Sequence, residues 1–163
     1  MNRFALSATG LMAATASAAP VEINVTLDYW AGEAGIAIFD SSSNTVASFF
    51  VNSAGYLSAP GFSSIDFTLA NSTATSPYTS GYSMTLYGDF AAGDYSIVLT
   101  DSYGDGWAWA NAIGGIDGYG GAASGSAIVF SSGSIASGTF SVVPAPAGLA
   151  LLGLAGLSRR RRG

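Results

Sequence analysis

The stretch DSYGDGW at residues 101–107 places two carboxylates and two glycines directly after the apolar run YSIVLT. Gly104 and Gly106 permit the left-handed backbone of a tight loop, into which Asp101 and Asp105 direct their oxygens. Ca²⁺ prefers clustered carboxylate and carbonyl oxygens as ligands. The stretch therefore predicts a loop that holds a calcium ion, and Glu33 becomes a third ligand if the chain folds it against this loop.

The loop does not follow the EF-hand pattern. Asp101, Asp105 and Gly106 fill the first, fifth and sixth positions of that pattern, but Tyr103 stands at the third. The twelfth position, where an EF-hand has a bidentate Glu, is Ala112. Any calcium site here is consequently of another type.

Aromatic residues in and beside this loop suggest a second chemistry. Trp107 and Trp109 share a face of an extended segment, and with Tyr103 they form a stacking platform for a sugar. A purely structural alternative stays open for the whole stretch. In it, Asp101 and Asp105 only accept backbone N–H groups of the turn, and the rings fill a core.

Residues 21–143 show the period of two that is typical of strands. In VEINVTLDYW (21–30), apolar side chains alternate with polar ones. The other segments expected to be strands are 35–40, 45–52, 64–70, 82–88, 95–101, 126–131 and 138–143. About eight short strands separated by turn residues favour an all-β, antiparallel β-sandwich of jelly-roll type, with a small barrel as the alternative. GGIDGYGGAASGSA (114–127) is expected to be a loop.

Residues 24–141 resemble a group of secreted and cell-surface β-domains with the motif G-x-Y-x-x-x-x-x-D-S-Y-G-D-G-W. The matching residues are Gly93, Tyr95, Asp101, Ser102, Tyr103, Gly104, Asp105, Gly106 and Trp107. LDYWAGEAGIAIFD (27–40) is similar to an earlier block of that group, with Ile36 in place of its second Trp. The resemblance implies a β-domain outside the cell and no particular activity.

The charges are segregated along the chain. All five basic residues lie at its two ends, as Arg3 and the run Arg159–Arg162, and all ten acids lie between Glu22 and Asp117. This acidic body excludes nucleic acid as a partner, because nucleic-acid binding needs a basic surface. It also has no His, Cys or Lys with which to build a nucleophilic site. Paired carboxylates hydrolyse glycosides, but a glycine-rich surface turn is a poor place to raise a carboxyl pKa, so we expect no enzyme.

The first 18 residues have the pattern of a secretory signal peptide. One Arg precedes a modest apolar stretch, and Ala16-Ser17-Ala18 supplies the small-residue pattern for cleavage after Ala18. The alternative is a buried first helix of the domain, which would bury little apolar area because it is rich in Ala, Ser and Thr. We expect a signal helix over residues 1–18, followed by a secreted β-sandwich over residues 19–142.

The C-terminal residues 143–163 read VPAPAGLALLGLAGLSRRRRG. An unbroken helix after Pro146 would cover 147–157 and span about 16 Å, well short of the roughly 30 Å hydrocarbon core of a bilayer. The four arginines that follow it are a cytoplasmic stop under the positive-inside rule. A short hydrophobic helix that enters the inner membrane only transiently is favoured over a permanent anchor or a solvated basic tail.

This tail also resembles the PEP-CTERM sorting signals that exosortases process. The sorting motif is formed by Val143, Pro144 and Pro146, the short helix follows it, and the cluster at the end consists of Arg159, Arg160, Arg161 and Arg162. Ala145 stands where the family name has Glu, so this is a VPAP variant. The resemblance implies that the Sec translocon and an exosortase-like enzyme are partners, and that the product reaches the surface of a Gram-negative-type bacterium.

Together these features predict an exported, non-enzymatic cell-surface or extracellular-matrix protein. The alternative is a calcium-dependent carbohydrate-binding module that uses the 101–109 loop, with a polysaccharide as its partner. Calcium is the only cofactor that the residues suggest.

Overall fold

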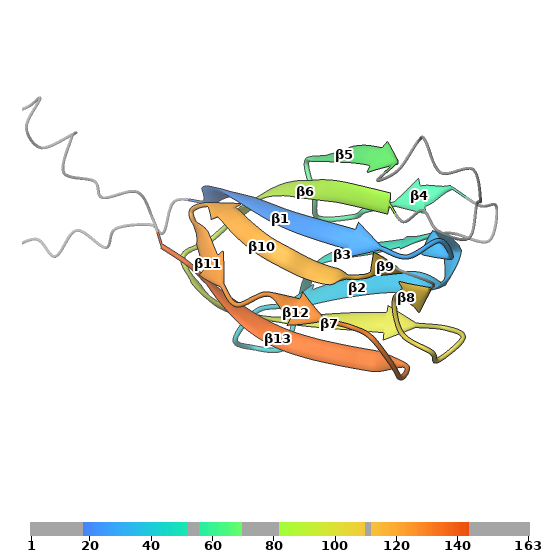
Figure 1. Cartoon of the computed structure of the whole chain (residues 1–163). Coiled ribbons are helices and arrows are strands. Elements are labelled where there is room, and N and C mark those ends of the chain that lie inside the picture. Colours follow the sequence, from blue (N-terminus) through green and yellow to red (C-terminus); the bar gives the residue numbers. More distant parts are fainter. Residues whose placement is uncertain (1–17, 52–55, 70–81, 110–111, 144–163) are drawn as a thin grey trace, which may run out of the picture.

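The computed structural model describes residues 18–51, 56–69, 82–109 and 112–143. These residues form two antiparallel β-sheets packed face to face, which confirms the all-β sandwich (Figure 1). The strands are β1 (Ala19–Leu27), β2 (Ala34–Phe39), β3 (Thr45–Val51), β4 (Leu57–Ser58), β5 (Ser64–Leu69), β6 (Tyr82–Phe90), β7 (Gly93–Asp101), β8 (Ala108–Trp109), β9 (Ala112–Ile113), β10 (Gly115–Gly121), β11 (Ala123–Gly125), β12 (Ile128–Val129) and β13 (Ile135–Val142). One 3₁₀ turn, η1 (Ala31–Glu33), connects β1 to β2.

Within the described ranges, one sheet has the order β12-β10-β1-β6-β5 and the other has the order β11-β13-β7-β2-β3-β4. A separate short ladder joins β8 to β9. Strands that are distant in the sequence become neighbours, since β1 lies between β10 and β6, and β7 lies between β13 and β2. These crossovers bring the β1–β2 connection and the end of β7 to the same end of the sandwich (Figure 1).

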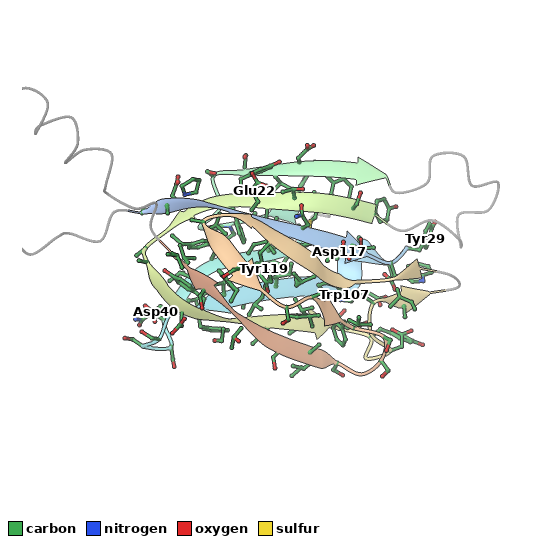
Figure 2. All side chains as sticks on the ribbon, turned by 60° about the vertical axis from the view of Figure 1, so that its left-hand side comes forward. Glu22, Tyr29, Asp40, Trp107, Asp117 and Tyr119 are labelled. Atoms are coloured by element: carbon green, nitrogen blue, oxygen red, sulfur yellow. The ribbon has the colours of Figure 1, made fainter. Side chains whose placement is uncertain are left out.

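The alternation expected in VEINVTL is confirmed in β1. Val21, Ile23, Val25 and Leu27 are buried, whereas the residues between them are exposed or half-buried. Figure 2 shows side chains filling the space between the sheets, with Glu22 and Asp117 among those on the outside. The core residues are Ala19, Val21, Ile23, Val25, Leu27, Ala34, Ile36, Ile38, Ala47, Phe49, Met84, Leu86, Phe90, Tyr95, Ile97, Leu99, Trp107, Ile116, Ala123, Phe130, Phe140 and Val142.

The hairpin expected around SSSN is also confirmed, and a single carboxylate organises its turn. Asp40 Oδ1 accepts hydrogen bonds from the backbone N–H groups of Ser42 and Asn44, each at 2.9 Å. Ser43 adopts a positive φ of 64°. Hydrogen bonds from the Asn44 side chain are the main cause that holds the pKa of Asp40 below its ordinary value, and the backbone hydrogen bonds add to it.

The expectation that GGIDGYGGAASGSA is a loop is wrong. Residues 115–121 form β10, an interior strand that pairs with both β1 and β12. At Gly115 the backbone has a φ of 148°, and a Cβ would meet the carbonyl oxygen of Ile128. The glycines therefore allow neighbouring backbones to approach closely within a sheet, a role that composition alone does not distinguish from loop flexibility.

The first strand begins close to the point where the last strand ends. The backbone N–H of Ala122 donates to the carbonyl of Pro20 at 2.7 Å, and the carbonyl of Ala122 accepts from Val143 at 3.0 Å. The start of β1 and the end of β13 therefore lie at the same end of the sandwich (Figure 1). The expected signal helix and C-terminal hydrophobic helix fall outside the described residues. Within the described ranges, no helix is long and apolar enough to span a membrane.

Candidate metal centre

The pairing of β2 with β7 brings the two acidic segments together. Ala34, the first residue of β2, is opposite Asp101, the last residue of β7. Glu33, immediately before β2, accepts a hydrogen bond from the backbone N–H of Ser102 through its carbonyl at 3.1 Å. The strand expected over 21–30 ends at Leu27 instead, which leaves room for the turn that carries Glu33.

Asp101 shapes the loop that follows β7. Its Oδ1 accepts hydrogen bonds from the backbone N–H groups of Tyr103 at 2.7 Å and Gly104 at 2.9 Å. Gly106 has a φ of 85°, and a Cβ there would lie 2.4 Å from the backbone nitrogen of Ser132. Only glycine fits this position, and its presence allows the tight loop conformation in which Asp105 is exposed.

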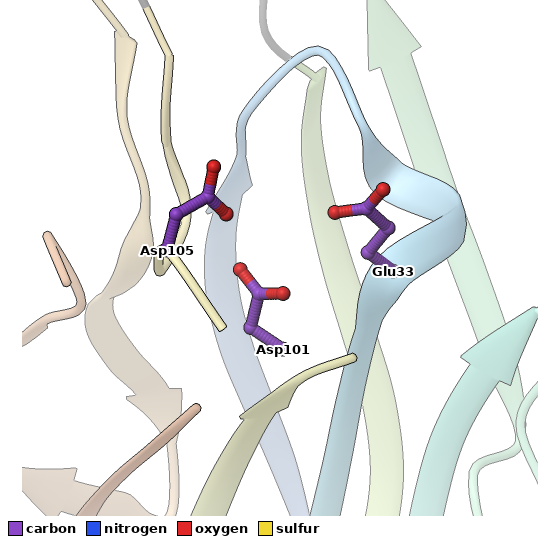
Figure 3. A group of neighbouring side chains, drawn as sticks. All are labelled: Glu33, Asp101 and Asp105. Atoms are coloured by element: carbon purple, nitrogen blue, oxygen red, sulfur yellow. The ribbon is translucent and has the colours of Figure 1, made fainter. Parts of the chain in front are cut away.

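The carboxylates of Glu33, Asp101 and Asp105 converge on one space (Figure 3). One oxygen from each side chain lies within 4.8 Å of the others. Oxygens bound to one calcium ion at 2.3–2.6 Å lie at most about 5.2 Å apart, so the three fall within the range of a shared ion. The structure thus brings together the three residues named from the sequence as metal ligands.

A fourth carboxyl group, that of Asp28, lies near enough to interact with the charges of Asp101 and Asp105. It is only 6% exposed, and its Oδ1 accepts a hydrogen bond from the backbone N–H of Trp30 at 2.9 Å. Burial is the main cause that raises the pKa of Asp28 above its ordinary value, and the charges of Asp101 and Asp105 add to it. Asp28 belongs to the block LDYWAGEAGIAIFD that resembles the secreted β-domains, but it was not predicted to be part of the site.

The part of the chain that the structure describes contains no basic side chain to balance these carboxylates. Asp101 is only 4% exposed, and the sequence contains no Lys, Arg or His between Arg3 and Arg159. Burial, followed by the charges of Asp101 and Asp105, also raises the pKa of Glu33. Both carboxyls with raised pKa values, Asp28 and Glu33, lie in the β1–β2 connection and not in the glycine-rich turn after β7. A divalent cation bound here would supply a counter-charge.

The structure does not form the expected platform of Trp107 and Trp109. Trp107 is 1% exposed, its ring packs against Phe130 at a centroid distance of 5.4 Å, and its Nε1–H donates to the carbonyl of Thr100 at 3.1 Å. Trp107 therefore anchors the loop in the core, as the structural alternative proposed. Trp109 lies in β8, but its side chain falls outside the described part of the structure.

A different pair of aromatic residues flanks the carboxylates. A pocket of about 270 Å³ is lined by Trp30, Glu33, Tyr103 and Asp105. Trp30 is 44% exposed and Tyr103 is 79% exposed. Tyr103 was expected near the site, whereas Trp30 was missed because it was assigned to a strand. Its position two residues after Asp28 and directly before the glycine-containing turn AGE is the sequence signal for it.

Val143 is the one residue of the expected sorting motif within the described ranges, and it is exposed at the end of β13. Pro144, Pro146 and Arg159–Arg162 lie outside those ranges. The chain matches no protein-family model, no curated protein sequence and no solved structure.

Proposed function

We propose that this chain is an exported, non-enzymatic surface protein whose β-sandwich binds a calcium ion at Glu33, Asp101 and Asp105. The observation that carries the calcium site is the convergence of three carboxylate oxygens to within 4.8 Å in a domain without a basic residue. Ca²⁺ takes six to eight oxygen ligands, so three carboxylates leave positions for backbone carbonyls, water or a ligand.

Calcium is expected to raise the melting temperature of the full chain, since an ion that binds only the folded state stabilises it. At a free calcium concentration about 100 times Kd, the gain is about 2.7 kcal/mol. Thermal unfolding followed by circular dichroism, in excess CaCl₂ and in EDTA, measures the shift. Asp105→Asn should reduce the shift strongly, because it removes one charged ligand. Asp105 is exposed, so the substitution leaves the core intact.

Asp66→Asn is the matched control, because it removes the same charge from the exposed face of β5, outside the cluster. This variant should keep the full calcium shift. Equal melting temperatures in CaCl₂ and EDTA would contradict the calcium site. Equal shifts in the Asp105 and Asp66 variants would place the ion elsewhere.

The proposed export and surface location are supported by the sequences of the two chain ends and by the residues at which the β-sandwich begins and ends. The first strand begins at Ala19, next to the expected cleavage site, and the last ends at Val142, next to the expected sorting motif. The partners in this proposal are the Sec translocon and an exosortase-like enzyme, with a transient stay in the inner membrane. We also propose that the strands are connected as in a jelly roll. The crossovers that flank β1 and β7 support this connectivity.

Protein recovered from its native host is expected to have lost both ends. Its intact mass should correspond to a chain without residues 1–18 and without Arg159–Arg162, because both segments are signals for processing. A variant with all four arginines replaced by glutamine should keep its C-terminal segment, since the cytoplasmic stop is gone. A mass that includes the four arginines in the original chain would refute processing of the tail.

A further inference from the structure

The pocket beside the carboxylates combines two features that a sugar-binding site requires. Its walls include the exposed rings of Trp30 and Tyr103, and Glu33 and Asp105 of the candidate calcium site also line it. At about 270 Å³ it is slightly below the range of roughly 300–1,000 Å³ that is typical of pockets for drug-sized molecules. It therefore fits one small unit of a ligand better than a large rigid molecule.

We propose that this pocket binds one sugar unit of a neutral polysaccharide, and that two adjacent hydroxyl groups of the sugar coordinate the calcium ion. This inference rests on the calcium site proposed above. Hydroxyl oxygens are hard ligands of the kind that Ca²⁺ takes, and the three carboxylates leave several of its six to eight positions open. The C–H face of the sugar then packs against the electron-rich face of Trp30 or Tyr103.

The charge of the site favours a neutral saccharide over an acidic one. One divalent ion balances only two of the three negative charges, and the carboxyl group of Asp28 lies near them. No Lys, Arg or His of the sequence between Arg3 and Arg159 offsets the remaining negative charge. A uronic acid would be repelled by this surface, whereas a neutral sugar contributes oxygens without adding charge.

The local structure also presents the two rings rather than burying them. Trp30 lies in the connection between β1 and β2, and Tyr103 lies in the loop after β7, so two separate segments form the pocket. The backbone N–H groups of both residues donate to carboxylates of the site, Trp30 to Asp28 and Tyr103 to Asp101. Folding of the acidic loops thus fixes the positions of the rings beside the ion.

Calcium-dependent binding of the full chain to mannan, dextran and arabinogalactan, measured by isothermal titration calorimetry, tests the proposal, with polygalacturonate as the acidic comparison. At least one neutral polysaccharide should bind in CaCl₂ and none in EDTA. Trp30→Ala and Tyr103→Ala should each weaken binding about tenfold, because each removes one packing face. Both variants should keep the calcium-induced rise in melting temperature, since their backbone N–H groups remain.

Tyr56→Ala is the control, because it removes an exposed ring that does not line this pocket. It should bind as the unchanged protein does. Binding that persists in EDTA, or that is unchanged in the Trp30 and Tyr103 variants, would overturn the proposal. Stabilisation by calcium without binding to any neutral polysaccharide would overturn this inference alone, whereas a missing calcium shift would refute the calcium site and this inference with it.

Discussion

Replacing Trp107 with alanine is expected to lower the free energy of unfolding by about 3–5 kcal/mol, the usual cost of truncating a buried large aromatic residue. Trp107 is among the largest fully buried side chains of the described core. The change leaves a cavity beside Phe130 and removes the hydrogen bond from the indole to the Thr100 carbonyl. Urea unfolding at equilibrium measures this loss.

Trp30→Ala is the matched control, because Trp30 is the same residue type on the surface beside the same loop. It should cost no more than about 1 kcal/mol, as is usual for substitutions away from the core. Trp107→Phe should lie between the two, since it keeps an aromatic ring but loses the donor. A Trp107→Ala protein as stable as the Trp30→Ala protein would contradict the structural role assigned to Trp107.

The substitution Gly106→Ala is expected to destabilise the domain and to weaken calcium binding at the same time. A Cβ at this position would lie 2.4 Å from the Ser132 nitrogen, in addition to the strain of an alanine at a φ of 85°. The strain costs about 1–2 kcal/mol, and the steric overlap adds about 1–3 kcal/mol. Because the 102–107 segment must move away from Ser132, Asp105 shifts relative to Glu33 and the calcium-induced stabilisation falls.

Gly133→Ala separates the two contributions. Gly133 has nearly the same φ, 87°, but a Cβ there would meet no atom within 4 Å. In this variant the free energy of unfolding should fall only by the cost of the backbone strain, and the calcium-induced rise in melting temperature should be unchanged. Urea unfolding and thermal melts with and without calcium measure both effects, and equal losses for the two variants would show that the close approach at Gly106 is not important.

The outlines of the sandwich could be predicted because its strands alternate buried and exposed residues. The pattern in β1 and the turn between β2 and β3 each depend on a few neighbouring residues, so local chemistry determines them. β10 could not be recognised in this way. Its glycines pair with β1 and β12, and the close backbone approach that requires them is made by segments far away in the sequence.

The residues of the candidate site also fall into those that neighbouring residues identify and those that depend on distant segments. Asp101 and Asp105 could be named from the glycines around them, which are short-range features. Glu33 could be named only on the condition that the chain folds it against this loop. Asp28 and Trp30 could not, because their roles depend on β1 ending at Leu27 and on the approach of the loop after β7. The burial of Trp107 depends likewise on Phe130, which comes from another segment.

The positions of the first and last strand residues decide how the domain would be displayed if it were held at its C-terminal end. Ala19 and Val142 lie at one pole, next to Gly93 at the start of β7, whereas Asp101 ends β7 at the other pole. A strand of nine residues is about 30 Å long. If the proposed sorting attaches the domain by its C-terminal end, a copy would hold its acidic loops away from the attachment point, and neighbouring copies would form a layer whose outer side carries these loops.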